Sequence, residues 1–270
     1  MPTARILVTG ASGFLGECAV RALRAAGHDV VTTSRTDPSI GVDLAAEGMV
    51  AAVLEAAAPD LVLNLAAMAR IDECERRPDA ARRLHVDVAE QFAQRFGARL
   101  LHVSTDLVFD GRGAPYAEAA APAPLSVYGV TKSEGEEHVR RHGGRVVRLP
   151  LLFGPDHRSR GASASLRRAI TAGTRSPMFT NEYRTPLHVV DAAQALAELV
   201  MDPDAPAIVH VPGPERVSRW EFARRLCAQH GLDEGLLVPV ECQDGLRPRD
   251  VSLIGLLPPR RSLDAMLADA

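Results

Sequence analysis

Lysine is almost absent from this sequence. The 270 residues contain 31 lysines and arginines together, and Lys132 is the one lysine among them. Because 34 acidic residues oppose these cations, the formal net charge is -3. This balance excludes a general nucleic-acid or membrane surface, so we expect neither as a partner.

Cysteine is also scarce and widely spaced. The four cysteines are Cys18, Cys74, Cys227 and Cys242, and no two of them form a C-x-x-C pair. This spacing indicates neither a metal cage nor a disulfide framework. The sequence therefore predicts no metal site and a cytoplasmic, reducing environment.

A long hydrophobic run that could cross a membrane is missing as well. The alanine-rich stretch Met49–Ala69 is interrupted by Glu55, Pro59 and Asp60, whereas a spanning helix needs about 20 consecutive apolar residues. A signal peptide is not expected, because an apolar run typical of a buried strand already begins at Arg5.

Short apolar runs alternate with helical patterns over the first 150 residues. The runs are continuous, as in "ILV" and "LVL", which is typical of parallel strands covered on both faces. Repeated strand–helix units predict an α/β fold with a Rossmann-like doubly wound parallel sheet. The predicted strands are Arg5–Thr9, Asp29–Ser34, Leu61–Asn64, Leu100–Ser104 and Arg145–Leu149, and the predicted helices are Gly13–Ala26, Ala45–Ala58, Asp79–Phe96 and Val127–Arg141.

After Pro150 the pattern becomes less regular. Gly154–Gly161 is typical of a loop, and "SRWEFARRLCAQHG" predicts a helix that Ser218 caps and Gly231 ends. We expect a Rossmann domain over residues 1–150, to which residues 184–211 return, and a small substrate-binding lobe made of residues 151–183 and 212–270.

The stretch "ILVTGASGFLG" places three glycines directly between the first strand and the first helix. One glycine lets the chain turn, a second permits a pyrophosphate to approach the backbone, and a third lets helix and strand pack closely. The phosphates then lie on the helix N-terminus, where free N–H groups favour negative charge. Gly10, Gly13 and Gly16 therefore predict a dinucleotide site.

The end of the second strand distinguishes NADP from NAD. An acidic residue there would hold the ribose 2′-hydroxyl of NAD, whereas a cation accommodates the 2′-phosphate of NADP. Here the strand ends in Ser34 and Arg35. The serine hydroxyl can hydrogen-bond a phosphate, and the arginine guanidinium can bind it with two donors. The sequence thus favours NADPH over NADH, and it places Asp43 and Leu44 beside the adenine.

Lys132 follows Tyr128 by four residues, so the two side chains share one helix face. A phenol ordinarily has a pKa of about 10, and a nearby ammonium stabilises the phenolate and lowers that pKa. Lysine can also extend to a cofactor ribose. Ser104–Asp106 ends a preceding strand at the same edge of the sheet, where a hydroxyl can hydrogen-bond a substrate carbonyl.

Together these motifs resemble an extended short-chain dehydrogenase/reductase. The segments "NLAAMARIDECERRPDAARRLHVD", "VSTDLVFDG", "PYAE", "APAPLSVYGVTKSEGE" and "RPRDVSL" are similar to the dTDP-4-dehydrorhamnose reductase family. They also resemble its relative, the regulatory β subunit of methionine adenosyltransferase. The likeness covers nearly the whole chain and implies an NADPH-dependent oxidoreductase that reduces a ketone, with a nucleotide-linked 4-keto-6-deoxysugar as the expected substrate.

The resemblance also implies roles for individual residues. Tyr128 would donate a proton to the ketone, Lys132 would tune the pKa of Tyr128 and anchor the ribose, and Thr105 would bind the carbonyl. Tyr128 and Lys132 would also belong to the cofactor-binding residues. Further cofactor residues would be Gly10, Ser12, Gly13, Phe14, Leu15, Gly16, Leu65, Ala66 and Ala67, and further substrate residues would be Met68, Ala69, Arg70, Asp106, Arg184 and Trp220.

The sequence departs from these families at two informative positions and after "RPRDVSL". His85 stands where asparagine is usual, and Leu107 replaces a common tyrosine after "STD". Two other functions stay open: a regulatory subunit that holds a cofactor without catalysis, and a redox-neutral epimerase or dehydratase. Dehydratases of this superfamily have Asp-Glu after the catalytic threonine. The helices Asp79–Phe96 and Val127–Arg141 could pair in a homodimer, and a monomer is equally arguable.

Overall fold

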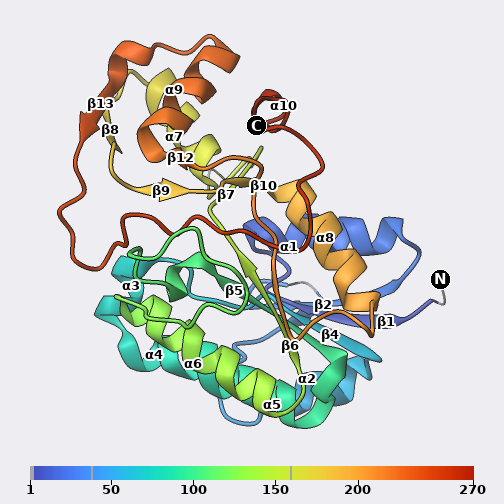
Figure 1. The fold of residues 1–270 in the computed structure, drawn as a ribbon. Helices are drawn as coiled ribbons and strands as arrows, with labels where there is room; N and C mark the ends of the chain where they lie inside the picture. The colour runs from blue at the N-terminus through green and yellow to red at the C-terminus, as the bar shows by residue number, and fades with distance from the viewer. Residues whose placement is uncertain (1–2, 38, 159) are drawn as a thin grey trace.

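A computed structural model describes residues 3–37, 39–158 and 160–270. A seven-stranded sheet lies at its centre, with helices on both faces (Figure 1). All neighbouring strands of this sheet are parallel, which confirms the predicted doubly wound α/β fold. In spatial order the strands are β11 (Ile208–His210), β6 (Arg145–Leu149), β5 (Leu100–Thr105), β4 (Leu61–Asn64), β1 (Arg5–Thr9), β2 (Asp29–Ser34) and β3 (Ile40–Gly41).

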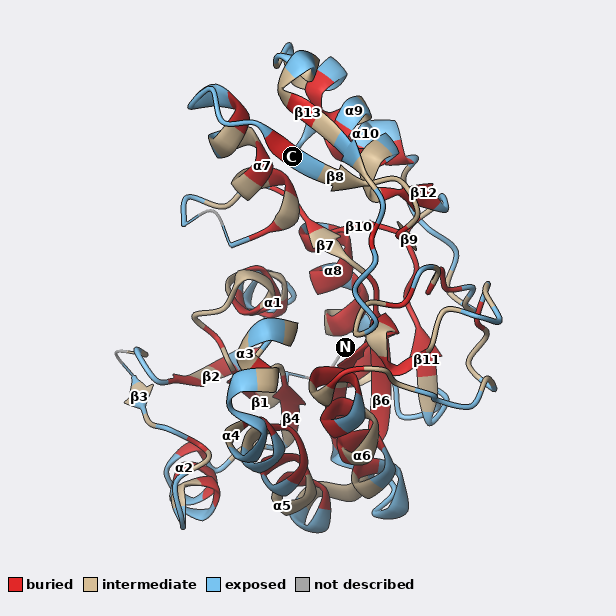
Figure 2. Cartoon of the chain, turned by 90° about the vertical axis from the view of Figure 1, so that its left-hand side faces the viewer, coloured by how far each residue is buried: buried red, intermediate tan, exposed pale blue. Residues whose placement is uncertain are grey.

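Helices cover the sheet because successive strand residues face opposite sides. In β1, Leu7 is buried in the cluster that contains helices α2 and α5, whereas Ile6 and Val8 are buried in the cluster that contains α1 and α8. Figure 2 shows buried residues along the strands and on the inward sides of the helices. The helices are α1 (Phe14–Ala25), α2 (Met49–Ala57), α3 (Ile71–Arg76), α5 (Val88–Phe96), α6 (Val127–Arg141) and α8 (Val189–Met201).

The helix predicted over Asp79–Phe96 is divided into three parts. Helix α4 (Pro78–Arg82) leads into a π-helical turn, η1 (Arg83–Asp87), before α5 begins. At this turn α6 comes very close, because a Cβ on Gly135 would lie 2.3 Å from the carbonyl oxygen of His85. Such π turns are frequent at functional sites.

A second group of elements, which we call the cap, lies above the sheet in Figure 1. The predicted helix between Ser218 and Gly231 is confirmed: Ser218 accepts the N–H of Glu221 at 3.0 Å, and Gly231 ends the helix with a φ of 61°. The division into two domains stays a prediction. The cap consists of α7 (Ala162–Thr171), β8 (Ser176–Phe179), β9 (Tyr183–Arg184), β12 (Val217–Ser218), α9 (Arg219–His230), β13 (Leu237–Val240) and α10 (Leu263–Ala268), and the pair β7 (Leu152–Phe153) and β10 (Leu187–His188) joins it to the sheet.

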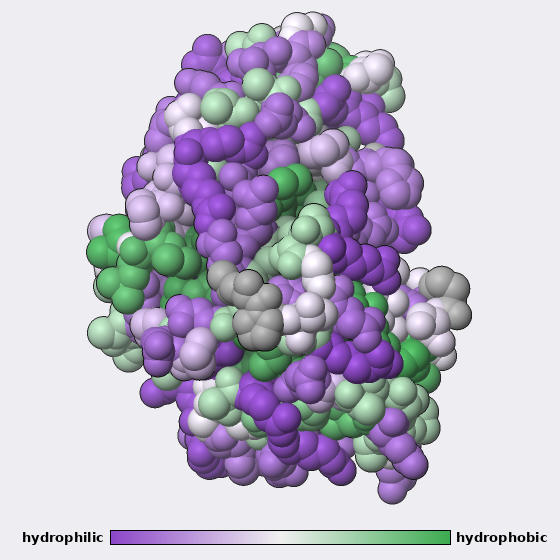
Figure 3. Space-filling view, turned by 90° about the vertical axis from the view of Figure 1, so that its right-hand side faces the viewer, coloured by the Kyte–Doolittle hydropathy of each residue, from purple (hydrophilic) through white to green (hydrophobic). Residues whose placement is uncertain are grey.

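The surface is mostly polar where Figure 3 shows it, with smaller apolar patches at mid-height. Within the three described stretches of the chain, no helix combines the length and apolar character that crossing a membrane requires.

Candidate active site

The turn after β1 is shaped to receive phosphate groups. A Cβ on Gly16 would lie 2.2 Å from the carbonyl oxygen of Gly10, and Gly10 itself has a φ of +64°. Helix α1 begins at Phe14, so its first N–H groups are free for an anion. A Cβ on Gly10 would also lie 3.0 Å from the carbonyl of Leu65. The turns after β1 and β4 therefore meet where the strand order reverses, the usual dinucleotide site of this fold.

The end of β2 carries the two side chains that the sequence assigned to the 2′-phosphate of NADP. Ser34 is buried, and its hydroxyl lacks a hydrogen-bond partner among the described residues, although buried hydroxyls are normally bonded. Arg35 beside it is exposed and can reach a ligand. Asp43 is exposed too, but Leu44 packs in the core with α2. The place of Asp43 and Leu44 beside the adenine stays a prediction.

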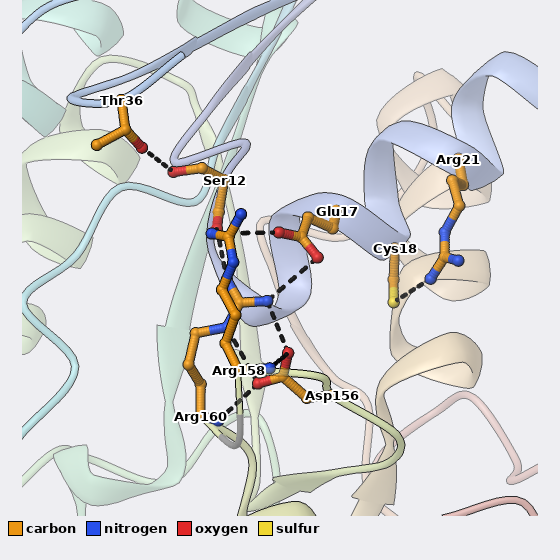
Figure 4. A network of polar contacts seen from close by, with 8 residues as sticks. All are labelled: Ser12, Glu17, Cys18, Arg21, Thr36, Asp156, Arg158 and Arg160. Atoms are coloured by element: carbon orange, nitrogen blue, oxygen red, sulfur yellow. Dashed lines mark hydrogen bonds and ion pairs between the residues drawn. The ribbon is translucent and has the colours of Figure 1, made fainter.

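Two arginines from the loop after β7 hold the glycine turn (Figure 4). Arg160 donates to the carbonyl of Ser12 and pairs with Glu17 at 3.1 Å and with Asp156 at 2.9 Å. Arg158 lies 3.6 Å from Glu17 and 3.5 Å from the Ser12 carbonyl. We call this set of contacts the latch. It connects the segment leading into the cap with the turn that would bind the pyrophosphate.

We expect the latch to stabilise the glycine turn locally. We expect Arg160→Ala to increase amide hydrogen exchange in residues 10–17 by about fivefold, which corresponds to about 1 kcal/mol for a partly exposed, charge-assisted contact. Arg168→Ala, an exposed arginine of α7, is the matched control and should leave that exchange unchanged. Equal exchange in both variants would show that the latch does not stabilise the turn.

The three predicted catalytic residues, Thr105, Tyr128 and Lys132, are all buried. Tyr128 and Lys132 are 9% and 2% exposed, and both lie on α6, which Ser126 caps by accepting the N–H of Gly129 at 3.2 Å. Thr105 ends β5 and donates to Asp106 at 3.1 Å, and its hydroxyl lies near the Tyr128 phenol. The two hydroxyl groups are therefore neighbours, and Thr105 can bind a carbonyl oxygen when its proton turns away from Asp106.

The structure corrects the expected effect of Lys132 on Tyr128. Burial raises the pKa of Tyr128 above its ordinary value, and the Thr105 hydrogen bond opposes this only in part. Lys132 instead donates to the carbonyl of Val103 at 2.6 Å, and its Nζ lies 3.0 Å from His102 Nε2. Helical spacing predicted a shared face, but strand β5 decides where the amine lies. The phenol consequently keeps its proton throughout the neutral pH range.

Charged groups of the cap gather beside Thr105. Arg184 Nε lies 3.4 Å from Asp106 Oδ2, and its Nη2 lies 3.3 Å from Glu182. Burial raises the pKa of Asp106 to about 6, while Arg184 opposes this shift. Arg247 lies 3.6 Å from Glu182, and the buried Nη1 of Arg219 lacks a partner among the described residues. The sequence pointed to Arg184 and missed Glu182, Arg219 and Arg247, although Arg247 lies in the quoted "RPRD" segment.

The remaining predicted substrate residues are not brought together in the same way. The N–H of Met68 donates to His85 at 2.9 Å, whereas Ala69 is exposed and Arg70 pairs with Asp72 at 3.1 Å on the surface. Trp220 is half-buried and packs against the core cluster of α1 and α8. The structure therefore places Asp106 and Arg184 beside Thr105, but leaves Arg70 and Trp220 in other surroundings.

His85 explains how the site accommodates the missing asparagine. Its Nε2 accepts the Met68 N–H, so Nδ1 carries the proton and donates to Thr131 Oγ1 at 2.8 Å. Burial lowers the pKa of His85 to about 3, which keeps the ring neutral. The ring meets Tyr128 edge-on, with 5.7 Å between the ring centroids. His85 thus links the loop after β4 to the helix that carries Tyr128.

Known proteins are similar to this chain in sequence and in fold. A family model described as "RmlD substrate binding domain" matches residues 4–251. The methionine adenosyltransferase 2 subunit beta of Pongo abelii is 31% identical, over 94% of this chain and 81% of the relative. "Probable low-salt glycan biosynthesis reductase Agl14" of Haloferax volcanii is 31% identical, over 89% and 85%.

A solved structure shows the same architecture. The dTDP-4-dehydrorhamnose reductase of Bacillus anthracis, in complex with NADP, superimposes with a TM-score of 0.88 at 22% identity, covering 98% of both chains. At this identity the likeness bears on the fold alone, and it agrees with the match of the family model. The chain therefore belongs to the RmlD substrate-binding family of extended short-chain dehydrogenases/reductases.

Proposed function

We propose that this protein is an NADPH-dependent oxidoreductase that reduces the ketone of a nucleotide-linked 4-keto-6-deoxysugar. The observation that carries the proposal is the buried phenol of Tyr128 near the Thr105 hydroxyl, at the edge of the sheet where the glycine turn lies. The names of the Bacillus anthracis and Haloferax volcanii relatives, both reductases, support it.

The chemistry divides between cofactor and protein. A nicotinamide bound along the carboxyl edge would supply the hydride for the carbonyl carbon. The hydroxyls of Thr105 and Tyr128 bind the carbonyl oxygen and stabilise the negative charge that develops on it. Tyr128 then transfers its proton to that oxygen as general acid. The phenol carries this proton at neutral pH before the reaction begins.

The arginines of the cap support a nucleotide-linked substrate. Arg184, Arg219 and Arg247 surround the single carboxylate of Glu182, and Asp106 balances part of the remaining positive charge. A diphosphate is a ligand that guanidinium groups bind with paired hydrogen bonds. We therefore favour a substrate that carries its sugar on a nucleoside diphosphate.

Specific observations bear on the two other functions. Similarity to a methionine adenosyltransferase subunit favours a regulatory role, whereas the buried, neighbouring hydroxyls of Thr105 and Tyr128 favour catalysis. Leu107 occupies the position of the second dehydratase carboxylate, so the acid needed for that reaction is replaced by an apolar side chain.

A screen of NADPH oxidation against nucleotide-linked 4-ketosugars tests the proposal. We expect turnover with at least one sugar of this class, measured by the loss of NADPH absorbance. Tight cofactor binding without turnover on any of them would instead support the regulatory role.

Coenzyme choice gives a separate prediction. Arg35→Ala should weaken NADPH binding at least tenfold more than NADH binding, because it removes a charge-assisted contact made only with the 2′-phosphate. Fluorescence titration with both coenzymes measures the difference. Arg99→Ala, which changes an arginine next to the opposite end of β5, is the control and should affect neither. If Arg35→Ala weakens both coenzymes equally, Arg35 does not recognise the phosphate.

A further inference from the structure

A chain of buried polar groups runs beneath the two turns and ends at Lys132. Thr9 Oγ1 lies 2.6 Å from Asn64 Oδ1, Asn64 Nδ2 lies 3.0 Å from His102 Nδ1, and His102 Nε2 lies 3.0 Å from Lys132 Nζ. None of the four side chains is more than 2% exposed. Their hydrogen bonds must therefore be satisfied within the protein, and this requirement fixes the direction of each one.

The direction is set at Thr9. Its hydroxyl accepts the backbone N–H groups of Leu65 and Ala66, each at 3.1 Å. A hydroxyl has two lone pairs and one proton, so the proton is left for Asn64 Oδ1. The N–H of Ala66 also lies 3.3 Å from that oxygen. Two donors thus orient the Asn64 amide, and its NH2 group must face His102.

The orientation of Asn64 determines the tautomer of His102. Because Nδ1 accepts from Asn64, and because burial keeps the pKa of His102 well below its ordinary value, the neutral ring carries its proton on Nε2. That N–H faces Lys132. An ammonium offers only donors, so a charged Lys132 would oppose one donor with another. A neutral amine can accept from Nε2 and still donate to the Val103 carbonyl at 2.6 Å.

We infer that His102 is a positioning residue whose Nε2–H favours the neutral amine of Lys132 over its ammonium. The inference concerns the protonation state of Lys132 alone and does not rest on the proposed function. It also explains why one lysine stands in a chain that otherwise uses arginine, because a guanidinium stays charged and has no lone pair to offer.

The other groups around Lys132 do not supply the same effect. His85 of η1 is neutral, and Tyr128 of α6 keeps its proton. Glu136, one turn further along α6, favours the ammonium, but its carboxylate is held by Arg148 of β6 at 2.6 Å. Burial outweighs Glu136 and lowers the pKa of Lys132 to about 8. His102 is thus the neighbour whose hydrogen bond distinguishes the two protonation states.

The single lysine makes the test direct. Protein grown with lysine carrying ¹³C at Cε gives one lysine side-chain signal, whose pH titration reports Lys132 alone. In His102→Gln the glutamine oxygen can turn toward an ammonium, so we expect the midpoint to rise by about one pH unit or more toward the ordinary value of about 10.4. The control is His138→Gln. His138 lies on α6 with Lys132, but its Nδ1 lies 2.9 Å from Glu90, so the lysine signal of this variant should titrate like that of the unchanged protein. A folded His102→Gln variant with an unchanged midpoint would overturn the inference.

A second measurement needs no variant. Nitrogen-15 spectra of the histidine rings, assigned through their backbones, should show the proton of His102 on Nε2 and that of His85 on Nδ1. A His102 ring protonated on Nδ1 would overturn the inference. Neither experiment uses turnover, so the inferred protonation state of Lys132 and the proposed reductase activity are tested independently.

Discussion

Tyr128→Phe is expected to lower kcat at least about a hundredfold while leaving the fold and the cofactor affinity nearly unchanged, because general-acid catalysis contributes on that scale. Phenylalanine keeps the ring that packs edge-on against His85 and removes only the hydroxyl near Thr105. Steady-state kinetics on a sugar found in the screen, together with cofactor titration, measure both quantities.

The chain contains a matched control for this substitution. Tyr116 is also buried, and its hydroxyl bonds Asp110 at 2.7 Å and the N–H of Gly113 at 2.9 Å, away from the predicted catalytic residues. Tyr116→Phe should reduce stability modestly and leave kcat within a few-fold of the original. Near-original kcat in Tyr128→Phe would remove Tyr128 from the mechanism.

Arg148→Met should destabilise the protein by about 3–5 kcal/mol and lower its melting temperature by roughly 6–20 °C. Arg148 and Glu136 are almost fully buried, and three contacts between them measure 3.0, 3.1 and 2.6 Å. Removing the guanidinium leaves the Glu136 carboxylate buried without its partner, which costs far more than the net contribution of the pair. Thermal and denaturant unfolding measure the change.

Two comparisons isolate this effect. Arg148→Met combined with Glu136→Leu should recover much of the lost stability, since replacing both partners removes the uncompensated charge. Arg141→Met breaks the exposed pair with Glu137 and should cost little. If Arg148→Met lowers the free energy of unfolding no more than Arg141→Met does, the buried Glu136 carboxylate does not depend on Arg148 for its stability.

Much of the fold could be predicted because its signals are local. Continuous apolar runs gave the observed bounds of β1, β2, β4 and β6, and Ser218 caps its helix as predicted. The π turn at His85 could not be predicted, because it depends on α6 approaching through Gly135. The short cap strands depend likewise on pairing between distant segments.

In the candidate site too, features with a local sequence pattern could be predicted, and features that join distant segments could not. Glycine spacing and the Tyr128–Lys132 interval are local patterns: the glycines lie in and next to the turn between β1 and α1, and Tyr128 and Lys132 lie on α6. The effect of Lys132 on Tyr128 was predicted wrongly, because helical spacing carries no information about burial or about the β5 groups that bind the amine. The latch and the Thr9–Asn64–His102 chain join segments far apart in the sequence, so no local signal pointed to either.

The central claim is net hydride transfer from NADPH to a sugar ketone, and an isotope experiment tests it most directly. NADPH carrying deuterium at the reactive nicotinamide carbon is supplied with a nucleotide-linked 4-ketosugar, and the product is analysed by mass spectrometry and NMR. We predict one deuterium at the former carbonyl carbon for each NADPH oxidised. A product formed without deuterium and without net coenzyme oxidation would contradict this account and establish a redox-neutral epimerase or dehydratase.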